Sequence, residues 1–411
     1  MPDDITLRSP APDELRAWID PLLSAFAEDY SDPEFESERP LLEPERLINA
    51  FDGERRIGSA GAYTFRLTVP GGEVGASGIT AVGVVPDQRR RGVLRQMMTW
   101  LLDDARARHE PVAVLWASEA AIYQRFGFGN GTWSSSFEVD RSKVVFRSPI
   151  PPRDGVRIRM VEPDEGVAIA MPIYEALRPV TPGSLTRPEL KWRNQLMPDA
   201  EWMRQGNGPK YRAVLEVDGQ PRGYVVYRIK SEWDPRGPKS VLTVMDLLAL
   251  DPEAEQRLWQ WVFAMDLVAT VRGWRLPVPN PLHQWLIEPR RLGLVVGDGL
   301  WLRLLDVPAA LAARTYAGEG TLVVDVDDAM IESNAGRWQL AVQGGSATVT
   351  RTTAEPDLAL DVGALASVYL GALRFIDLAR AGRVRTFNDD ALQTADVLFT
   401  PSRAPSCNTM F

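Results

Sequence analysis

Cysteine and histidine are almost absent from this sequence of 411 residues. It contains one cysteine, Cys407, and two histidines, His109 and His283. A single cysteine excludes a disulfide within one chain and suits a reducing cytoplasm, which is the location we predict. We also expect no metal site, because cysteine and histidine are the usual ligands of structural and catalytic metals. A histidine base is unpromising, since neither histidine has suitable neighbours.

Long apolar runs and an excess of positive charge are also missing. No run of about 18 apolar residues occurs, so we expect no membrane span, and the N-terminus lacks the basic and apolar regions of a secretory signal. The net charge of −9 at pH 7 argues against nucleic acid as a partner, because phosphate binding needs a basic surface. The negative charge fits either a cationic small-molecule substrate or plain solubility.

The length and the ordinary content of hydrophobic (45%) and charged (25%) residues predict two or three globular domains. We place the first at residues 1–148, where hairpin strands followed by a strand–helix–strand crossover predict a mixed α/β sheet. Its predicted strands are residues 5–7, 47–51, 57–69, 74–85, 112–116 and 133–139. Its predicted helices are residues 15–26, 90–108 and 120–125.

A proline-rich linker at residues 146–155 separates a second domain, residues 149–298, in which the first pattern partly repeats. A strand at 156–161 and a helix at 258–269 match elements of the first domain. Asp251, Glu253 and Glu255 precede this helix, where they would repel an anion. Residues 299–411 predict an α+β domain with strands at 321–326, 338–342 and 347–350 and helices at 362–371 and 375–381. Its apolar end, residues 404–411, is unusual for a free terminus and predicts docking.

The strongest chemical signal is a basic, glycine-containing loop between an apolar strand and a helix. Arg89, Arg90 and Arg91 precede Gly92 at the predicted helix start. Free N–H groups at a helix N-terminus bind anions, and guanidinium groups add charge-assisted hydrogen bonds to phosphate. Three arginines at this position are unfavourable against the helix dipole unless an anion is present. The alternative is an exposed basic helix start.

Three motifs resemble the enhanced-intracellular-survival (Eis) family of GNAT N-acetyltransferases. Arg89-x-x-Gly92 is similar to the acetyl-CoA motif of GNAT enzymes. Leu94 departs from the glycine or alanine of that motif, as in the Eis branch. Ser118-Glu119, followed by Tyr123 and an Arg-Phe-Gly segment, is the second likeness. The third is the final Cys-Asn-Thr-x-Phe, which ends at Phe411.

The resemblance extends over the whole chain and implies a domain layout, a co-substrate and site residues. The layout is a GNAT domain, a degenerate GNAT-like domain and a sterol-carrier-like domain. Acetyl-CoA is the implied co-substrate, at one site per chain, with no metal. Tyr123 is implied as the general acid and the α-carboxylate of Phe411 as the general base. The implied acetyl-CoA contacts are Val82, Gly83, Val84, Arg89, Arg90, Arg91, Gly92, Val93, Leu94, Arg95, Ser118 and Glu119.

The resemblance further implies a homo-oligomer, a hexamer, and acetylation of aminoglycosides, a route to antibiotic resistance. The acidic and aromatic residues Phe26, Glu28 and Asp29 predict a wall for a polycationic acceptor, or else a solvated loop. Other acceptors are a protein lysine or a polyamine. A different class is a non-catalytic protein that binds an apolar ligand. In that case Tyr123 is a packing residue and Phe411 belongs to a merely docked tail.

Overall fold

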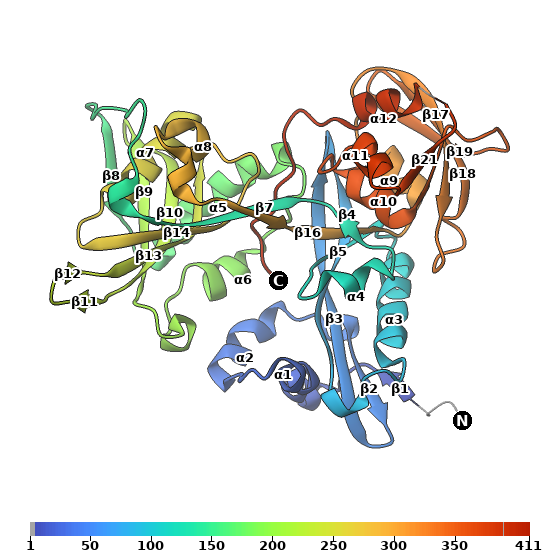
Figure 1. Cartoon of the computed structure of the whole chain (residues 1–411). Coiled ribbons are helices and arrows are strands. Elements are labelled where there is room, and N and C mark those ends of the chain that lie inside the picture. Colours follow the sequence, from blue (N-terminus) through green and yellow to red (C-terminus); the bar gives the residue numbers. More distant parts are fainter. Residues whose placement is uncertain (1–4, 389) are drawn as a thin grey trace.

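The chain forms two seven-stranded sheets and a smaller five-stranded sheet, each flanked by helices (Figure 1). This computed structural model describes residues 5–388 and 390–411. In spatial order the first sheet consists of β1 (Ile5–Arg8), β2 (Leu47–Asp52), β3 (Arg55–Val69), β4 (Gly72–Val84), β5 (Val112–Trp116), β16 (Leu300–Leu304) and β6 (Gly129–Asn130). No helix in the described part of the chain is long and apolar enough to cross a bilayer.

The second sheet takes one strand that we had predicted for the first domain. Its order is β15 (Val295–Asp298), β7 (Trp133–Asp140), β14 (Val268–Leu276), β13 (Ser240–Ala249), β10 (Gln220–Lys230), β9 (Lys210–Val217) and β8 (Val156–Met160). A short hairpin, β11 (Trp233–Asp234) and β12 (Gly237–Pro238), extends from it. The prediction that the strand at 133–139 closes the first sheet is wrong. That place is filled by β16, which pairs with β5 and β6.

Helices cover both faces of the first sheet. The amphipathic helix α3 (Val93–Ala107) packs on one face through Met97, Met98, Leu101 and Leu102. The short helices α1 (Asp20–Phe26) and α2 (Asp32–Glu38) lie on the opposite face (Figure 1). The remaining helices are α4 (Ala120–Gln124), α5 (Pro163–Leu177), α6 (Glu189–Lys191), α7 (Pro252–Ala264), α8 (Leu282–Trp285), α9 (Val307–Ala312), α10 (Val362–Tyr369), α11 (Phe375–Arg380) and α12 (Ala391–Phe399).

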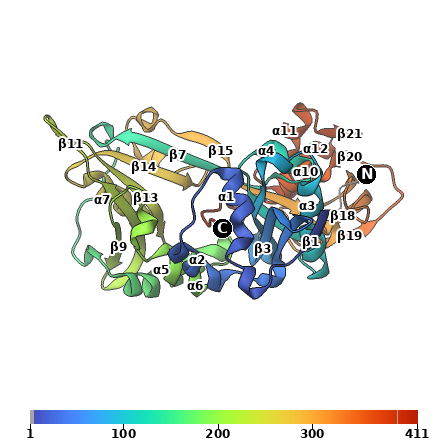
Figure 2. The same cartoon turned by 90° about the horizontal axis from the view of Figure 1, so that it is seen from below.

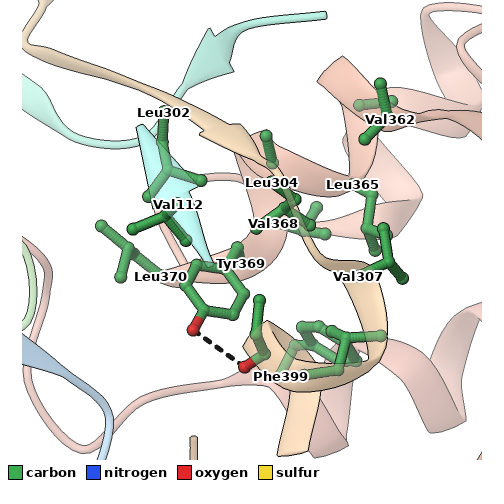
Figure 3. Packing of buried hydrophobic residues seen from close by; sticks show 14 of the residues in the cluster. Val112, Leu302, Leu304, Val307, Val362, Leu365, Val368, Tyr369, Leu370 and Phe399 are labelled. Atoms are coloured by element: carbon green, nitrogen blue, oxygen red, sulfur yellow. Dashed lines mark hydrogen bonds between the residues drawn. The ribbon is translucent and has the colours of Figure 1, made fainter. Parts of the chain in front are cut away.

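The third sheet has the order β19 (Ser346–Arg351), β18 (Gly336–Gln343), β17 (Gly320–Asp327), β20 (Leu358–Asp361) and β21 (Val384–Thr386). Its helices share one hydrophobic core with the first sheet, because α10 packs on β16 and β6. Figure 3 shows Val112 and Leu302 of the first sheet beside Leu365 and Val368 of α10. The hydroxyl of Tyr369 donates to the carbonyl of Ala310 in this core (2.9 Å). The α+β prediction for this region is therefore confirmed.

Three predicted helices have different bounds in the structure. The pattern at 15–26 gives short turns followed by α1, which begins only at Asp20. The helix predicted from residue 90 begins at Val93, because Arg90 and Gly92 have positive φ angles of 65° and 85°. The helix predicted to residue 269 ends at Ala264. Val268 and Ala269, the last residues of the predicted helix, belong to β14.

A buried arginine ties the first sheet to the helix beside it. Arg46 is completely buried and donates to both carboxylate oxygens of Glu110 (2.8 and 2.7 Å) and to Asp104 (3.2 Å). The hydroxyls of Thr64 and Ser77 accept its remaining hydrogen bonds. Because both its charge and its donors are satisfied, this arginine can remain ionised inside the core.

Candidate active site

The site begins where two parallel strands of the first sheet part. β4 pairs with β5 over three positions only, Ala76 to Gly78 against Val112 to Val114. Beyond Gly78, β4 remains bonded to β3 on its other edge, and Ala81 forms a bulge with φ of 53°. Among the described residues, no strand therefore lies beside the backbone of Val82, Gly83 and Val84 on the β5 side. Such an edge can pair with an extended, amide-containing ligand.

The basic loop joins this open strand to α3. Gly92 is the residue that caps α3, and its left-handed conformation places no side chain over the helix end. The first N–H groups of a helix have no partner within the helix. No side chain caps the start of α3, so the amides of Val93, Leu94 and Arg95 are available to an anion.

The four arginines of the loop differ in what they already bind. Arg91 is half-buried and donates to Asp52 (2.7 Å) and to Gln88. Arg89 donates weakly to the carbonyl of Ala25 (3.4 Å). Arg90 and Arg95 are exposed and make no ion pair with any described residue. We therefore expect Arg90 and Arg95 to be the readiest ligands for phosphate.

Tyr123 lies in α4, just after the end of β5. Ser118 and Glu119 precede this helix and are exposed. The Tyr123 side chain is buried, with its ring edge-on to Phe128 (6.0 Å between centroids). Its hydroxyl has no hydrogen-bond partner among the described residues. Burial, and then the charge of Glu119, raise the pKa of Tyr123 to about 12.

Phe411 lies on the other face of the sheet from Tyr123. Tyr123 belongs to the core beneath α3, together with Ala113 and Leu115 of β5. The ring of Phe411 packs edge-on against Phe65 (5.0 Å) and belongs to the core that includes Val114. Phe411 thus lies beside Gly78, where β4 and β5 part, and Tyr123 lies on the opposite face of the same sheet. Only a glycine at position 78 leaves room for the rings of Phe65 and Phe411.

The segment that ends at Phe411 is held between the two large sheets (Figure 2). The carbonyl of Thr409 accepts a hydrogen bond from the indole of Trp116 (2.9 Å). The Thr409 hydroxyl contacts Arg187 and Tyr174 (2.9 and 3.0 Å). The α-carboxylate of Phe411 itself makes no ion pair within the described chain. The tail is therefore docked, as predicted, and the α-carboxylate at its end has no ion-pair partner among the described residues.

Asp246 and Trp192, which belong to no motif in the sequence, take part in the contacts that hold the tail. Asp246 accepts hydrogen bonds from Arg187, Tyr224 and Asn408, each at 2.9 Å. The guanidinium of Arg187 also stacks over Trp192 (5.1 Å). Nothing in the sequence pairs these residues with the tail, because they are more than 150 residues away from it.

Phe26 ends α1, Glu28 and Asp29 follow it, and all three are exposed. No contact within the described residues joins them to the tail, so their role in acceptor binding stays a prediction. Glu38 lies closer to Phe411, since its carboxylate accepts hydrogen bonds from Tyr30 (2.5 Å) and Tyr63 (2.7 Å). The ring of Tyr63 adjoins Phe65 (5.9 Å).

The second sheet opens in the same way but lacks the phosphate loop. β13 pairs with β14 only as far as Val244. The N-terminus of α7 is filled by its own chain, because Asp251 accepts a hydrogen bond from the amide of Ala254 (2.9 Å). Arg222 binds the same carboxylate (2.8 Å). One acetyl-CoA site per chain stays a prediction. Among the described residues, no group of three cysteine, histidine or acidic side chains could hold a metal.

Family models match all three parts of the chain. Models of the acetyltransferase (GNAT) domain match residues 6–131 and residues 183–304. A model of the sterol carrier protein domain matches residues 307–408. Two GNAT domains followed by this third domain define the chain as an acetyltransferase, and the GNAT fold implies the use of acetyl-CoA.

The full-length relatives narrow this class to one family. An uncharacterized N-acetyltransferase of Streptomyces avermitilis is 41% identical over 96% of both chains. N-acetyltransferase Eis of Mycobacterium tuberculosis is 34% identical over 96% of both chains. The crystal structure of Eis1 from Mycobacterium abscessus superposes with a TM-score of 0.83 at 32% identity, covering 99% of this chain and all of that one. The chain belongs to the Eis family of GNAT N-acetyltransferases. The non-catalytic alternative is therefore set aside.

Proposed function

We propose that this enzyme transfers acetyl from acetyl-CoA to a primary amine at the opening between β4 and β5. The observation that supports this proposal is that Tyr123 and Phe411 lie on opposite faces of the sheet that contains this opening. A thioester inserted between the strands would lie between a proton donor and a carboxylate. This is what amine acetylation needs, because the amine loses a proton and the departing thiolate gains one.

Acetyl-CoA supplies the activated acetyl group, and the residues around the opening suit its pantetheine arm and its pyrophosphate. The free backbone edge of Val82, Gly83 and Val84 suits the pantetheine arm. The loop from Arg89 to Arg95 suits the pyrophosphate, with Ser118 and Glu119 nearby. The uncapped start of α3 and the unpaired guanidinium groups of Arg90 and Arg95 support this assignment.

The protonation states support the roles of acid and base. Because burial raises the pKa of Tyr123 to about 12, its phenol holds its proton throughout the neutral range and can donate it. The α-carboxylate of Phe411 has no cationic partner within the described chain, so it is available to accept the proton of the amine.

For the acceptor we propose an aminoglycoside-like polycation, with a polyamine or a protein lysine as the alternatives. The acidic residues of the first helices support a cationic acceptor, above all Glu38, which lies near the tail on the same face of the sheet. Glu28 and Asp29 can contribute longer-range attraction. The homo-hexamer implied by the resemblance remains part of this proposal.

The test measures CoA release with a panel of aminoglycosides, polyamines and a lysine peptide. We expect Tyr123→Phe to lower kcat by about 10²- to 10⁴-fold, the usual contribution of a general acid. Its stability should stay unchanged, because the lost hydroxyl has no partner. Extension of the chain beyond Phe411 by two glycines should have a similar effect on kcat. The same extension at the N-terminus is the control. Full activity in both Tyr123→Phe and the C-terminal extension would disprove the proposed roles.

The pH profile gives an independent check on Tyr123. The active form of this residue is the protonated one, and its raised pKa preserves that form beyond the usual tyrosine value of about 10. We therefore expect kcat to stay level between about pH 8 and pH 10. A fall in kcat centred near pH 10 or below that disappears in Tyr123→Phe would contradict the buried environment of the phenol.

A further inference from the structure

A cavity lies next to the C-terminal tail, on the side of the second sheet. Its volume is about 180 Å³. It opens where β13 and β14 part, and Asn408, Thr409 and Met410 form one wall. Four basic side chains line it, against one carboxylate, that of Asp246. The basic residues are Arg187, Lys191, Lys210 and Arg275.

The single carboxylate is already engaged. Asp246 forms an ion pair with Arg187 (2.9 Å) and accepts hydrogen bonds from Tyr224 and Asn408. Within the described chain, none of the other three basic residues has an acidic partner within ion-pair distance. The lining of the cavity therefore carries more positive than negative charge, in a setting where water screens it poorly. Outside the lining, Glu38 and Asp199 lie close enough to Lys191 and Lys210 to favour their charged forms, but neither forms an ion pair with them.

Arg275 has the arrangement of an anion ligand. Its guanidinium stacks over Trp274 (3.8 Å) and faces Trp116 (5.9 Å). None of its N–H groups has an acceptor among the described residues. Its backbone is left-handed, with φ of 53°, a conformation that costs free energy for a side chain of this size and is found preferentially at ligand sites. Burial lowers its pKa to about 10, so it remains charged at neutral pH.

Lys191 and Lys210 are more than nine-tenths buried, yet they donate only to neutral oxygens. Lys191 donates to the side-chain amide of Gln195 (3.0 Å), and Lys210 to the carbonyls of Gln195 and Leu196 (3.1 and 2.8 Å). Burial and the neighbouring arginines lower the pKa of Lys191 to about 8 and that of Lys210 to about 7. An anion in the cavity would offset this cost of holding two ammonium groups in the interior.

We propose that this cavity binds a carboxylate or phosphate group through Arg275, with Lys191 and Lys210 supplying further charge. The anionic group is either part of the acceptor amine or a separate small anion. Because Met410 and Thr409 of the cavity wall directly precede Phe411, an acceptor held here by its anion would have its amine close to the proposed base. The placement of the amine near Phe411 rests on the proposed function, whereas the anion-binding site does not.

The binding test uses inorganic phosphate and succinate at constant ionic strength, followed by tryptophan fluorescence and calorimetry. Two of the 13 tryptophans, Trp116 and Trp274, lie beside Arg275, so anion binding should change part of the fluorescence, and calorimetry measures the affinity independently. We expect Arg275→Gln to weaken binding at least about tenfold, the effect of losing one charge-assisted hydrogen bond. Arg275→Lys, which keeps the charge, should bind with intermediate affinity. Arg272→Gln is the matched control, since Arg272 is exposed on the same strand and pairs with Glu138 (2.8 Å).

Kinetics then distinguish the two sources of the anion. Amines that carry a carboxylate are compared with their uncharged amides as acceptors. A KM that rises in Arg275→Gln for the carboxylates alone identifies the anion as part of the acceptor. Anion binding that depends on Arg275 without this change identifies a separate anion. Wild-type protein that binds neither probe at about 50 mM, or binds equally well in Arg275→Gln, overturns the proposal, whatever the outcome of the CoA-release test.

Discussion

Gly78 offers a sharp test of the link between packing and catalysis, because it lies where β4 and β5 part. A Cβ atom at this position would lie 2.4 and 2.5 Å from two ring atoms of Phe65 and 3.1 Å from the ring of Phe411. Carbon atoms in contact are about 3.5–4.0 Å apart, so Gly78→Ala must displace the Phe65 ring by about 1 Å. Phe65 is buried and stacks against Phe411. Displacement of the Phe65 ring should therefore also shift Phe411.

We expect two separable effects from Gly78→Ala. Overpacking should lower the free energy of unfolding by about 1–3 kcal/mol. A shift of about 1 Å in the base should lower kcat by about 10²-fold. Gly75→Ala is the matched control on the same strand, since its Cβ would make only an ordinary contact with Glu110 (3.6 Å). The assays are CoA release and urea unfolding. If Gly78→Ala and Gly75→Ala have the same kcat, the terminal residue does not act as we propose.

Two further substitutions test the loop and the core. The Cβ atom of Gly92→Ala would meet no atom within 4 Å, so the substitution costs only the free energy of a left-handed backbone, about 1–2 kcal/mol. The KM for acetyl-CoA should rise. Gly219→Ala is the control, because Gly219 has a similar φ and equal space, and it should leave KM unchanged. Arg46→Ala leaves the Glu110 carboxylate buried and unpaired, and urea unfolding should show a loss of about 3–5 kcal/mol. In Arg39→Ala, which removes an exposed ion pair, the loss should not exceed about 1 kcal/mol.

Local patterns predicted most of the individual elements. The alternation of apolar residues located β2 to β5, and the Arg-Gly loop located the start of a helix to within three residues. The end of α7 was missed because an apolar run continues from the helix into β14, and hydrophobicity alone does not distinguish helix from strand there. Pro21 and the positive φ angles at Arg90 and Gly92 explain the two late helix starts.

Long-range partners could not be predicted from local patterns. A strand pattern at 133–139 identifies a strand but not the neighbour that it pairs with, and β7 joined the other sheet. The same limit hid the contact of Arg187 with Thr409, 222 residues further along the chain. The unused donors of Arg275 were also invisible, since an arginine beside a tryptophan in a sequence does not reveal whether an acceptor lies near it. The roles that we propose for Tyr123 and Phe411 came from the family resemblance, because composition and spacing did not indicate them.

The exchange of strands between the two large sheets has a consequence for synthesis on the ribosome. The first sheet needs β16, which is made about 170 residues after β6, the neighbour with which it pairs. Until Leu300–Leu304 emerges, the edge of β5 is unprotected and can pair with another nascent chain. The N-terminal domain therefore cannot mature as an independent unit during translation, and fragments that stop before β16 should aggregate. We therefore expect the proposed acetyl-CoA site, with the tail that we propose completes it, to form only when nearly the whole chain has been made.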